Sequence, residues 1–139
     1  MRITRETDYA LRMLRELSAA EQGEKQGRVS VREMADREMI PLQFAYKIVK
    51  KLEKGGLIRI SRGAEGGCSL TADLHEVSLF DLMRAMEEDT YMISCMEPGY
   101  VCQWRSANKN CRVHQQLALI QQRLDRELQG DMLWDIING

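Results

Sequence analysis

The chain has 139 residues and a mass of 16.1 kDa, which is the size of one ordinary domain. Hydrophobic residues make up 44% and charged residues 29% of it, a balance that excludes a disordered chain, a collagen-like repeat and a disulfide scaffold. No apolar run approaches the ~20 residues that span a bilayer, and residues 1–6 lack the apolar segment of a secretion signal. We therefore expect a cytoplasmic protein with no membrane partner, whose four cysteines are reduced thiols, metal ligands or redox sensors.

The net charge of −1 hides an asymmetry between the two halves of the chain. Residues 1–73 carry 14 Lys/Arg against 11 Asp/Glu, whereas residues 74–139 carry 6 against 10. Within the first part, the stretch 47–62 holds six basic residues and one acid. A local excess of this size suits contact with a phosphate backbone, although a charge run of this kind is also typical of a solvated helix face.

The first predicted elements are two helices separated by a loop. Residues 3–20 predict an amphipathic helix, and the polar, glycine-punctuated stretch 21–27 predicts a loop. Ser30 and Glu33 have the spacing of a capping box, so a short helix follows to about Asp36. The apolar stripe of the first helix comprises Ile3, Ala10, Met13, Leu14 and Leu17.

A third helix and a hairpin follow. Pro41 suits the first turn of a helix, which we expect to run to about Lys54, where two glycines end it. The buried stripe of this helix comprises Ala45, Ile48, Val49 and Leu52. Residues 57–60 and 68–70 predict short strands, joined by the glycine-rich turn 62–67. This order of elements is that of a winged helix-turn-helix, which lays its last helix in the major groove of DNA and its hairpin, the wing, on the neighbouring backbone or minor groove.

The second half of the chain combines an irregular segment with a long helix. Ser78 predicts the cap of a further helix, and residues 88–111 show no sustained period. The long amphipathic helix that follows has a seam formed by Val113, Leu117, Ile120, Leu124 and Leu128, and a short terminal piece covers 132–137. We expect this seam to pair with a second copy of the chain, the alternative being that it packs on its own domain.

Three cysteines of the irregular segment form a candidate metal site. Cys95, Cys102 and Cys111 have the spacing C-x6-C-x8-C, and His114 follows three residues after the last. Thiolates are soft ligands for iron–sulfur clusters, zinc or copper(I). The spacing favours an iron–sulfur cluster over zinc, since structural zinc sites usually have paired ligands about two to four residues apart. Cys68 stands alone in the second strand and is predicted to pack there.

These elements together predict a mainly α fold with a small β-hairpin. Residues 1–73 form the winged helix-turn-helix, residues 74–111 a connecting helix and the cysteine-bearing loop, and residues 112–139 the dimerisation helix with its terminal segment.

Four features occur in a characteristic order: T-D-Y-A-L-R at 7–12, G-L-I at 56–58, R-G-x-x-G-G-x-x-L at 62–70, and three cysteines before an amphipathic helix. Together they resemble the IscR/NsrR (Rrf-two) family of dimeric winged-helix regulators, over nearly the whole chain. The resemblance implies a homodimeric transcriptional regulator, most typically a repressor and not an enzyme. It also implies sensing of iron, redox or nitric oxide status through an iron–sulfur cluster.

The resemblance implies Cys95, Cys102 and Cys111 as cluster ligands. Two residues match the fourth ligand of different branches: His114, and Asp8 contributed by the partner subunit. We favour His114, because the i, i+3 spacing places it beside Cys111 without need of the other chain. The cluster type, 2Fe–2S or 4Fe–4S, follows the ligand set and stays open.

The other expected partner is double-stranded DNA with a palindromic operator. The candidate DNA-binding residues on the third helix and the wing are Gln43, Phe44, Tyr46, Lys47, Lys50, Arg59, Ser61, Arg62 and Gly63.

Two other functions compete with a cluster-sensing regulator. A thiol switch or a zinc-bound regulator would use the same cysteines without a cluster. A small iron–sulfur electron carrier belongs to another class, and the basic helix and wing argue against it. The glycine-rich stretch 62–67 lies between strands and does not open a helix, so it is no phosphate loop. Since the chain has only two histidines and no recognisable Ser/His/Asp set, we expect no catalytic residues.

Overall fold

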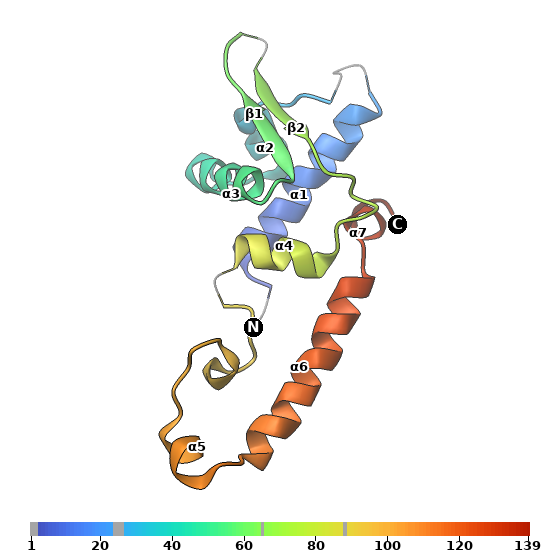
Figure 1. The fold of residues 1–139 in the computed structure, drawn as a ribbon. Coiled ribbons are helices and arrows are strands. Elements are labelled where there is room, and N and C mark those ends of the chain that lie inside the picture. Colours follow the sequence, from blue (N-terminus) through green and yellow to red (C-terminus); the bar gives the residue numbers. More distant parts are fainter. Residues whose placement is uncertain (1–2, 24–26, 65, 88) are drawn as a thin grey trace.

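Two parts make up the molecule, a helical head and an arm that extends from it (Figure 1). This computed structural model describes residues 3–23, 27–64, 66–87 and 89–139. The head contains α1 (Arg5–Glu21), α2 (Val31–Glu38), α3 (Leu42–Lys54), β1 (Ile58–Ser61), β2 (Gly67–Leu70), α4 (Leu79–Met86) and α7 (Leu133–Asn138). The arm contains the short 3-10 helix η1 (Ser94–Met96), α5 (Gln103–Asn108) and α6 (Arg112–Gly130). A mainly α fold with one antiparallel hairpin confirms the predicted class. Over the ranges just given, no helix has the length and apolar character needed to cross a membrane.

Helix α1 provides the central stripe of the head core. Ala10, Met13, Leu14 and Leu17 are all fully buried, as their spacing predicts. Ile3, which was expected on the same stripe, is exposed. The helix begins only at Arg5, after Thr4 as N-cap, so Ile3 lies before the helical period starts. At the other end the helix runs to Glu21, and residues 24–26 of the predicted loop lie outside the described residues.

Helix α2 and the turn after it set the start of α3. Ser30 caps α2, its Oγ accepting the N–H of Glu33 at 3.1 Å, and the helix ends at Glu38, two residues beyond the predicted end. Met39 then adopts a left-handed backbone conformation, φ 54° and ψ 45°, with its side chain 85% exposed. This conformation is costly for a residue with a Cβ atom.

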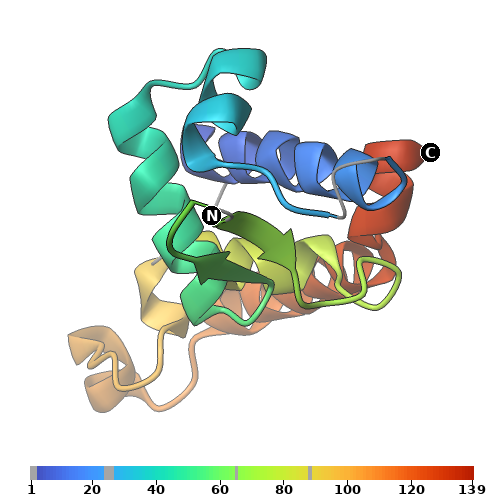
Figure 2. The same ribbon diagram turned by 90° about the horizontal axis from the view of Figure 1, so that it is seen from above.

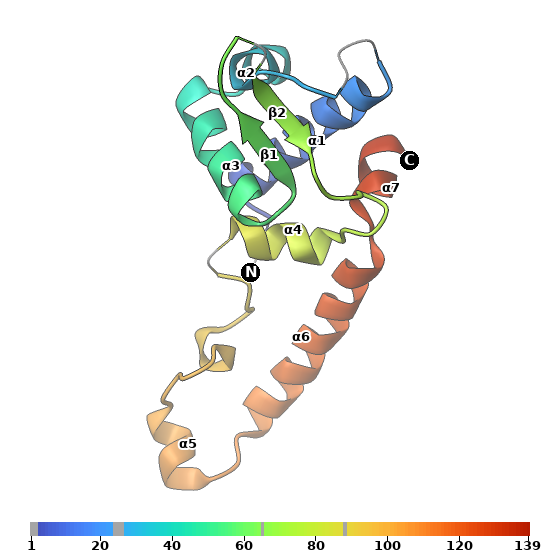
Figure 3. The ribbon, with the colours of Figure 1, turned by 45° about the horizontal axis from the view of Figure 1, so that its top comes forward.

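Helix α3 lies beside the hairpin (Figure 3). Its predicted stripe is buried throughout, and Gly56, with φ +78°, takes the left-handed conformation that follows the helix. The strands pair in the register Ile58↔Leu70 and Ile60↔Cys68. Gly67 lies so close to Val29 that a Cβ atom there would be 3.1 Å from the Val29 carbonyl oxygen, which lets Val29 and Cys68 exchange backbone hydrogen bonds of 3.0 and 2.7 Å.

The C-terminal segment returns from the arm to the head. The N–H groups of Leu133 and Trp134 donate to the carbonyls of Val77 and Leu74 at 2.8 and 3.0 Å. Leu133 is fully buried in the head core, and α7 packs beside α1 (Figure 2). The terminal segment, which the sequence grouped with the dimerisation helix, therefore packs as part of the head.

The left-handed Met39 provides a test of local strain. We expect Met39→Gly to raise the free energy of unfolding by about 0.5–1 kcal/mol, because glycine adopts this conformation without the Cβ penalty and an exposed side chain loses little packing. Urea denaturation measures this change. Met39→Leu keeps the Cβ atom and should give no gain. A lower stability for Met39→Gly would show that the side chain packs against the protein in solution.

Candidate nucleic-acid interface and cysteine arm

The outer face of α3 exposes a basic and aromatic surface. Because the opposite stripe of α3 is buried, the predicted residues of this face point to solvent. The exposed residues are Gln43, Phe44, Tyr46, Lys47 and Lys50. This mixture of an amide, two aromatic rings and two ammonium groups suits contact with base edges, sugars and phosphates.

The wing continues this surface. Arg59, Arg62 and Gly63 are exposed and Ser61 is half-buried. Tyr46, Lys50 and Arg62 line a shared hollow of about 250 Å³ between α3 and the wing. The N–H of Ile60 donates to Oε2 of Glu53 at 2.9 Å, which fixes the wing strand against α3. The structure therefore brings the predicted residues Tyr46 and Lys50 of the helix together with Arg62 of the wing.

Glu6 at the start of α1 is a neighbour of this surface that sequence reasoning missed. Its carboxylate lies 2.8 Å from Nζ of Lys47 and 2.6 Å from Nζ of Lys51. Hydrogen bonds from Lys47 and then Lys51 hold the pKa of Glu6 below its usual value. No local pattern signals this contact, because more than 40 residues separate the partners in the sequence.

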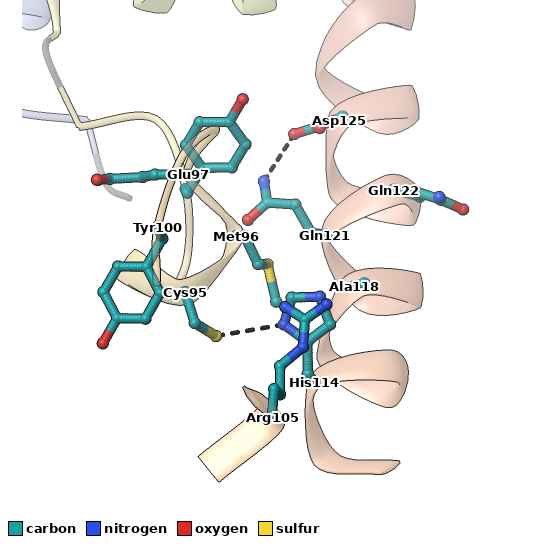
Figure 4. A pocket seen from close by; sticks show the side chains of 11 residues that line it. Cys95, Met96, Glu97, Tyr100, Arg105, His114, Ala118, Gln121, Gln122 and Asp125 are labelled. Atoms are coloured by element: carbon teal, nitrogen blue, oxygen red, sulfur yellow. Dashed lines mark hydrogen bonds between the residues drawn. The ribbon is translucent and has the colours of Figure 1, made fainter. Parts of the chain in front are cut away.

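Two of the predicted metal ligands meet on the arm. Sγ of Cys95 lies 3.3 Å from Nδ1 of His114 (Figure 4). Cys111 is the N-cap of α6, and its Sγ accepts the backbone N–H of His114 at 3.3 Å. His114 thus contacts one cysteine through its ring and another through its backbone.

A hollow of about 400 Å³ surrounds the Cys95–His114 pair. Met96, Tyr100 and Arg105 contribute to its wall (Figure 4). Cys102 precedes α5 as its N-cap residue and is half-buried, like Cys95 and Cys111.

The donor chemistry of the arm fits a soft-metal group, since three half-buried thiols and an imidazole occur within 20 residues. The ligands are only partly assembled: within the described ranges, no three His, Cys, Asp or Glu residues lie close enough together to hold a metal ion. Cys95 and His114 are paired, and of the three candidate cysteines Cys102 is the one that makes no contact with His114 in the described structure.

Gln121 anchors the arm internally. Although polar, it is buried. Its Oε1 accepts the N–H of Met92 at 2.6 Å, and its Nε2 donates to Asp125 at 2.8 Å. The chain that carries Cys95 is therefore held against α6 one and a half to two turns from His114.

Asp8, the other candidate for fourth ligand, lies in the head. Its carboxylate pairs with Arg12 at 3.0 Å. Arg12 also donates to the carbonyl of Glu38 at 3.0 Å and lies over the ring of Tyr9. Within one chain, Asp8 is thus part of an ion pair on α1 and is not gathered with the cysteines of the arm.

Cys68 is separate from the arm and packs in the head core, as predicted. Burial, with a smaller effect from the Glu53 charge, raises its pKa to about 11. The thiol of Cys68 is therefore neutral at physiological pH.

The predicted seam of α6 is partly open to solvent in the single chain. Val113 and Leu124 are 67% and 40% exposed, while the other three seam residues, Leu117, Ile120 and Leu128, are half-buried. Exposed apolar side chains on one face of a helix suit contact with a protein partner.

Comparisons with known proteins show which family the chain is similar to. The Rrf2 family model, described as an iron-dependent transcriptional regulator, matches residues 3–139. Protein aau3 of Rhizobium meliloti (strain 1021) is 36% identical over 101 residues, covering 73% of this chain and 63% of that protein. The HTH-type transcriptional repressor NsrR of Streptomyces coelicolor is 32% identical over 117 residues, covering 84% of this chain and 75% of that protein. The chain spans a little under two thirds of the length of the first two curated relatives, 63% and 66%.

Solved structures confirm the fold. CymR, the global cysteine regulator of B. subtilis, matches with a TM-score of 0.72 at 19% identity, over 99% of this chain and 96% of that one. T. potens IscR matches with a TM-score of 0.69 at 17% identity, over 99% and 86%. The relatives whose names state a function are transcriptional regulators and not enzymes, as the sequence resemblance predicted.

The reactivity of the four thiols tests whether Cys68 is buried in the head while the other three cysteines are accessible on the arm. In reduced, metal-free native protein, we expect Cys95, Cys102 and Cys111 to react quickly with an aromatic disulfide reagent at pH 8 and Cys68 only after unfolding. With a pKa of about 11, Cys68 is ionised in only about one molecule in a thousand at that pH, and it is buried as well. Cys68→Ala should leave the three fast thiols unchanged. Four fast thiols in the native protein would contradict the burial of Cys68.

Proposed function

The chain belongs to the Rrf2 family of transcriptional regulators, and on this premise we propose that it is a homodimeric, DNA-binding repressor that senses iron, redox or nitric oxide status through an iron–sulfur cluster. The observation that carries the sensing proposal is the contact of Cys95 with His114, one turn from Cys111. This group lies on an arm joined to a head with an exposed basic surface. A regulator acts where its DNA lies, so we place it in the cytoplasm.

We assign DNA reading to the head. The exposed face of α3 enters the major groove, where Gln43 offers the amide that pairs with adenine and Lys47 and Lys50 neutralise phosphates. Arg62 on the wing suits a narrow minor groove, whose negative potential attracts arginine. Gly63, with φ +105° and open space around it, lets the wing backbone approach the DNA closely.

We assign dimerisation to α6. A second copy of the chain would cover the exposed seam residues Val113 and Leu124, and a two-fold arrangement places two heads on the half-sites of a palindromic operator. Residues 112–130 then join the two copies, while α7 completes the head of each.

We assign the cluster to Cys95, Cys102 and Cys111, with His114 as fourth ligand and Asp8 of the partner subunit as the alternative. When bound, such a cluster supplies an inorganic core that reacts with oxidants and nitric oxide. Sγ of Cys111 accepts the amide N–H of His114, and the ring of His114 is directed at Cys95. Gln121 keeps the Cys95 segment on α6, so gathering Cys102 with the other ligands requires movement of the chain between η1 and α5. Gly99, with φ +81°, lies between η1 and α5 and allows the chain to turn there.

A thiol switch or zinc site is the second candidate, and one observation favours it. The thiol of Cys95 is half-buried and lies 3.3 Å from an imidazole nitrogen. A cysteine thiol can be oxidised, and thiol and imidazole groups are both zinc ligands. An electron carrier is disfavoured by the family to which the chain belongs.

The DNA-binding proposal is tested by removing single positive charges. We expect Arg62→Ala and Lys47→Ala each to weaken DNA binding, because each removes a phosphate or groove contact. The slope of log K against log salt should fall by about one for Arg62→Ala and by less for Lys47→Ala, whose ammonium group also pairs with Glu6. Gel shifts with genomic fragments over a range of salt measure both effects, and cluster content should not change. Lys109→Ala, which removes a charge from the exposed tip of the arm, is the matched control. Equal loss with Lys109→Ala would contradict the assignment to helix and wing.

The cluster proposal is tested by anaerobic purification and reconstitution. We expect iron, sulfide and visible absorbance in the wild type, and their loss in Cys102→Ser. The fold should be kept, with the free energy of unfolding changed by about 0.5 kcal/mol or less, because Cys102 lies outside the head core. Cys68→Ala should keep the cluster. A further comparison of His114→Ala with Asp8→Asn identifies the fourth ligand as the residue whose loss changes the absorbance.

Three outcomes would contradict parts of this proposal. Colourless, iron-free protein after careful reconstitution rules out the cluster, and stoichiometric zinc would then support the second candidate. Unfolding of Cys102→Ser would make the cysteines structural. Equal operator affinity with and without the cluster would rule out sensing.

A further inference from the structure

Three helices of the head meet in a polar contact at the base of the arm. Glu6 comes from the first turn of α1, Lys47 and Lys51 come from α3, and Met86 is the last residue of α4. Nζ of Lys47 lies 2.8 Å from Oε1 of Glu6, and Nζ of Lys51 lies 2.6 Å from Oε2. Lys51 also donates to the carbonyl oxygen of Met86 at 3.1 Å. The proposed DNA-reading helix is thus tied to the point where the chain leaves the head for the cysteines.

Glu87, the residue after Met86, adds hydrogen bonds between the end of α4 and the start of α1. Oε1 of Glu87 accepts the hydroxyl of the fully buried Thr7 at 2.6 Å, and it also accepts the hydroxyl of Thr4. The start of α1 and the end of α4 accordingly lie side by side at the base of the arm (Figure 1). Glu6 is held in place, since the helix that carries it is fixed on both sides of it.

Glu6 and DNA require the same ammonium group. The side chain of Lys47 is 57% exposed on the proposed DNA face, whereas that of Glu6 is only 18% exposed beneath it. The lysines keep the pKa of Glu6 low, so the carboxylate is ionised at neutral pH. A phosphate that approaches Lys47 therefore meets a cation that is already paired with an anion.

We propose that Glu6 sets the strength of DNA backbone binding by competing with phosphate for Lys47. The inference rests on the proposed DNA-binding function and deepens it. Through Lys51 and the Met86 carbonyl, the same carboxylate is linked to the base of the cysteine arm.

The test uses the full chain and a random-sequence DNA duplex, with binding measured by fluorescence anisotropy over a range of salt. We expect Glu6→Gln to bind about threefold to tenfold more tightly at low salt, with the slope of log K against log salt steeper by less than about 0.9, because Lys47, which Glu6 shares with phosphate in the wild type, becomes fully available to phosphate. Glu6→Ala should show the same gain, which guards against an effect specific to glutamine. Thermal unfolding of each variant verifies that it is folded at the temperature of the assay.

Two further variants test whether the gain depends on the contact between Glu6 and Lys47. In the Lys47→Met background, Glu6→Gln should lose most of its gain, because the lysine that it releases is absent. Glu21→Gln removes the same charge from the exposed far end of α1 and should change the affinity by less than about twofold, as expected for a distant, screened charge.

The outcomes separate this inference from the function on which it rests. Unchanged or weaker binding by Glu6→Gln and Glu6→Ala, with Arg62→Ala still weakening it, overturns the inference and leaves DNA binding intact. An equal gain with Glu21→Gln reduces the effect to net charge and also overturns it. Absence of salt-sensitive binding in the wild type removes the DNA-binding function, and the inference with it.

Discussion

Burial of one face of α3 is the constraint on which the rest of the head depends. Four apolar residues at helical spacing pack into the core with α1, and burial of each stabilises the fold by about 1.5–3 kcal/mol for the larger side chains. Because a helix has a fixed period, the opposite face must point to solvent. The basic and aromatic residues of α3 are therefore displayed as a rigid surface, and the bond from Ile60 to Glu53 holds the wing beside it.

The arm is attached to this head at two separate places. At one end, the carbonyl of Met86 and the carboxylate of Glu87 bind residues of α3 and α1. At the other end, backbone hydrogen bonds from the segment after α6 and the buried Leu133 fix the helix to the head. The cysteine-bearing chain lies between these two attachments.

The cysteines divide by environment into two chemical types. Cys68 is buried, neutral and part of the core, while the other three are half-buried on the arm. His114 contacts Cys95 through its ring and Cys111 through its backbone N–H. Sensing by a cluster and sensing by thiols both draw on this second group, which explains why the same arm suits either chemistry.

Local signals in the sequence determined the elements of this protein. These signals are the helical spacing of apolar residues, the caps Ser30 and Ser78, and the glycines around the hairpin. Each of them influences the conformation of only a few neighbouring residues. For the same reason, the exposed face of α3 and the packing of Cys68 followed from pattern alone. The three-cysteine set was recognisable by its spacing, and the family by the order of its motifs.

Contacts between distant segments were decided only by the tertiary structure. The pairing of Glu6 with Lys47, the position of α7 in the head and the contact between Cys95 and His114 each join residues from different elements. Their existence depends on the angle at which helices pack and on which faces meet, and no local period encodes either quantity. The sequence therefore determined which side chains are available for chemistry, and the packing of the helices decided which of them meet.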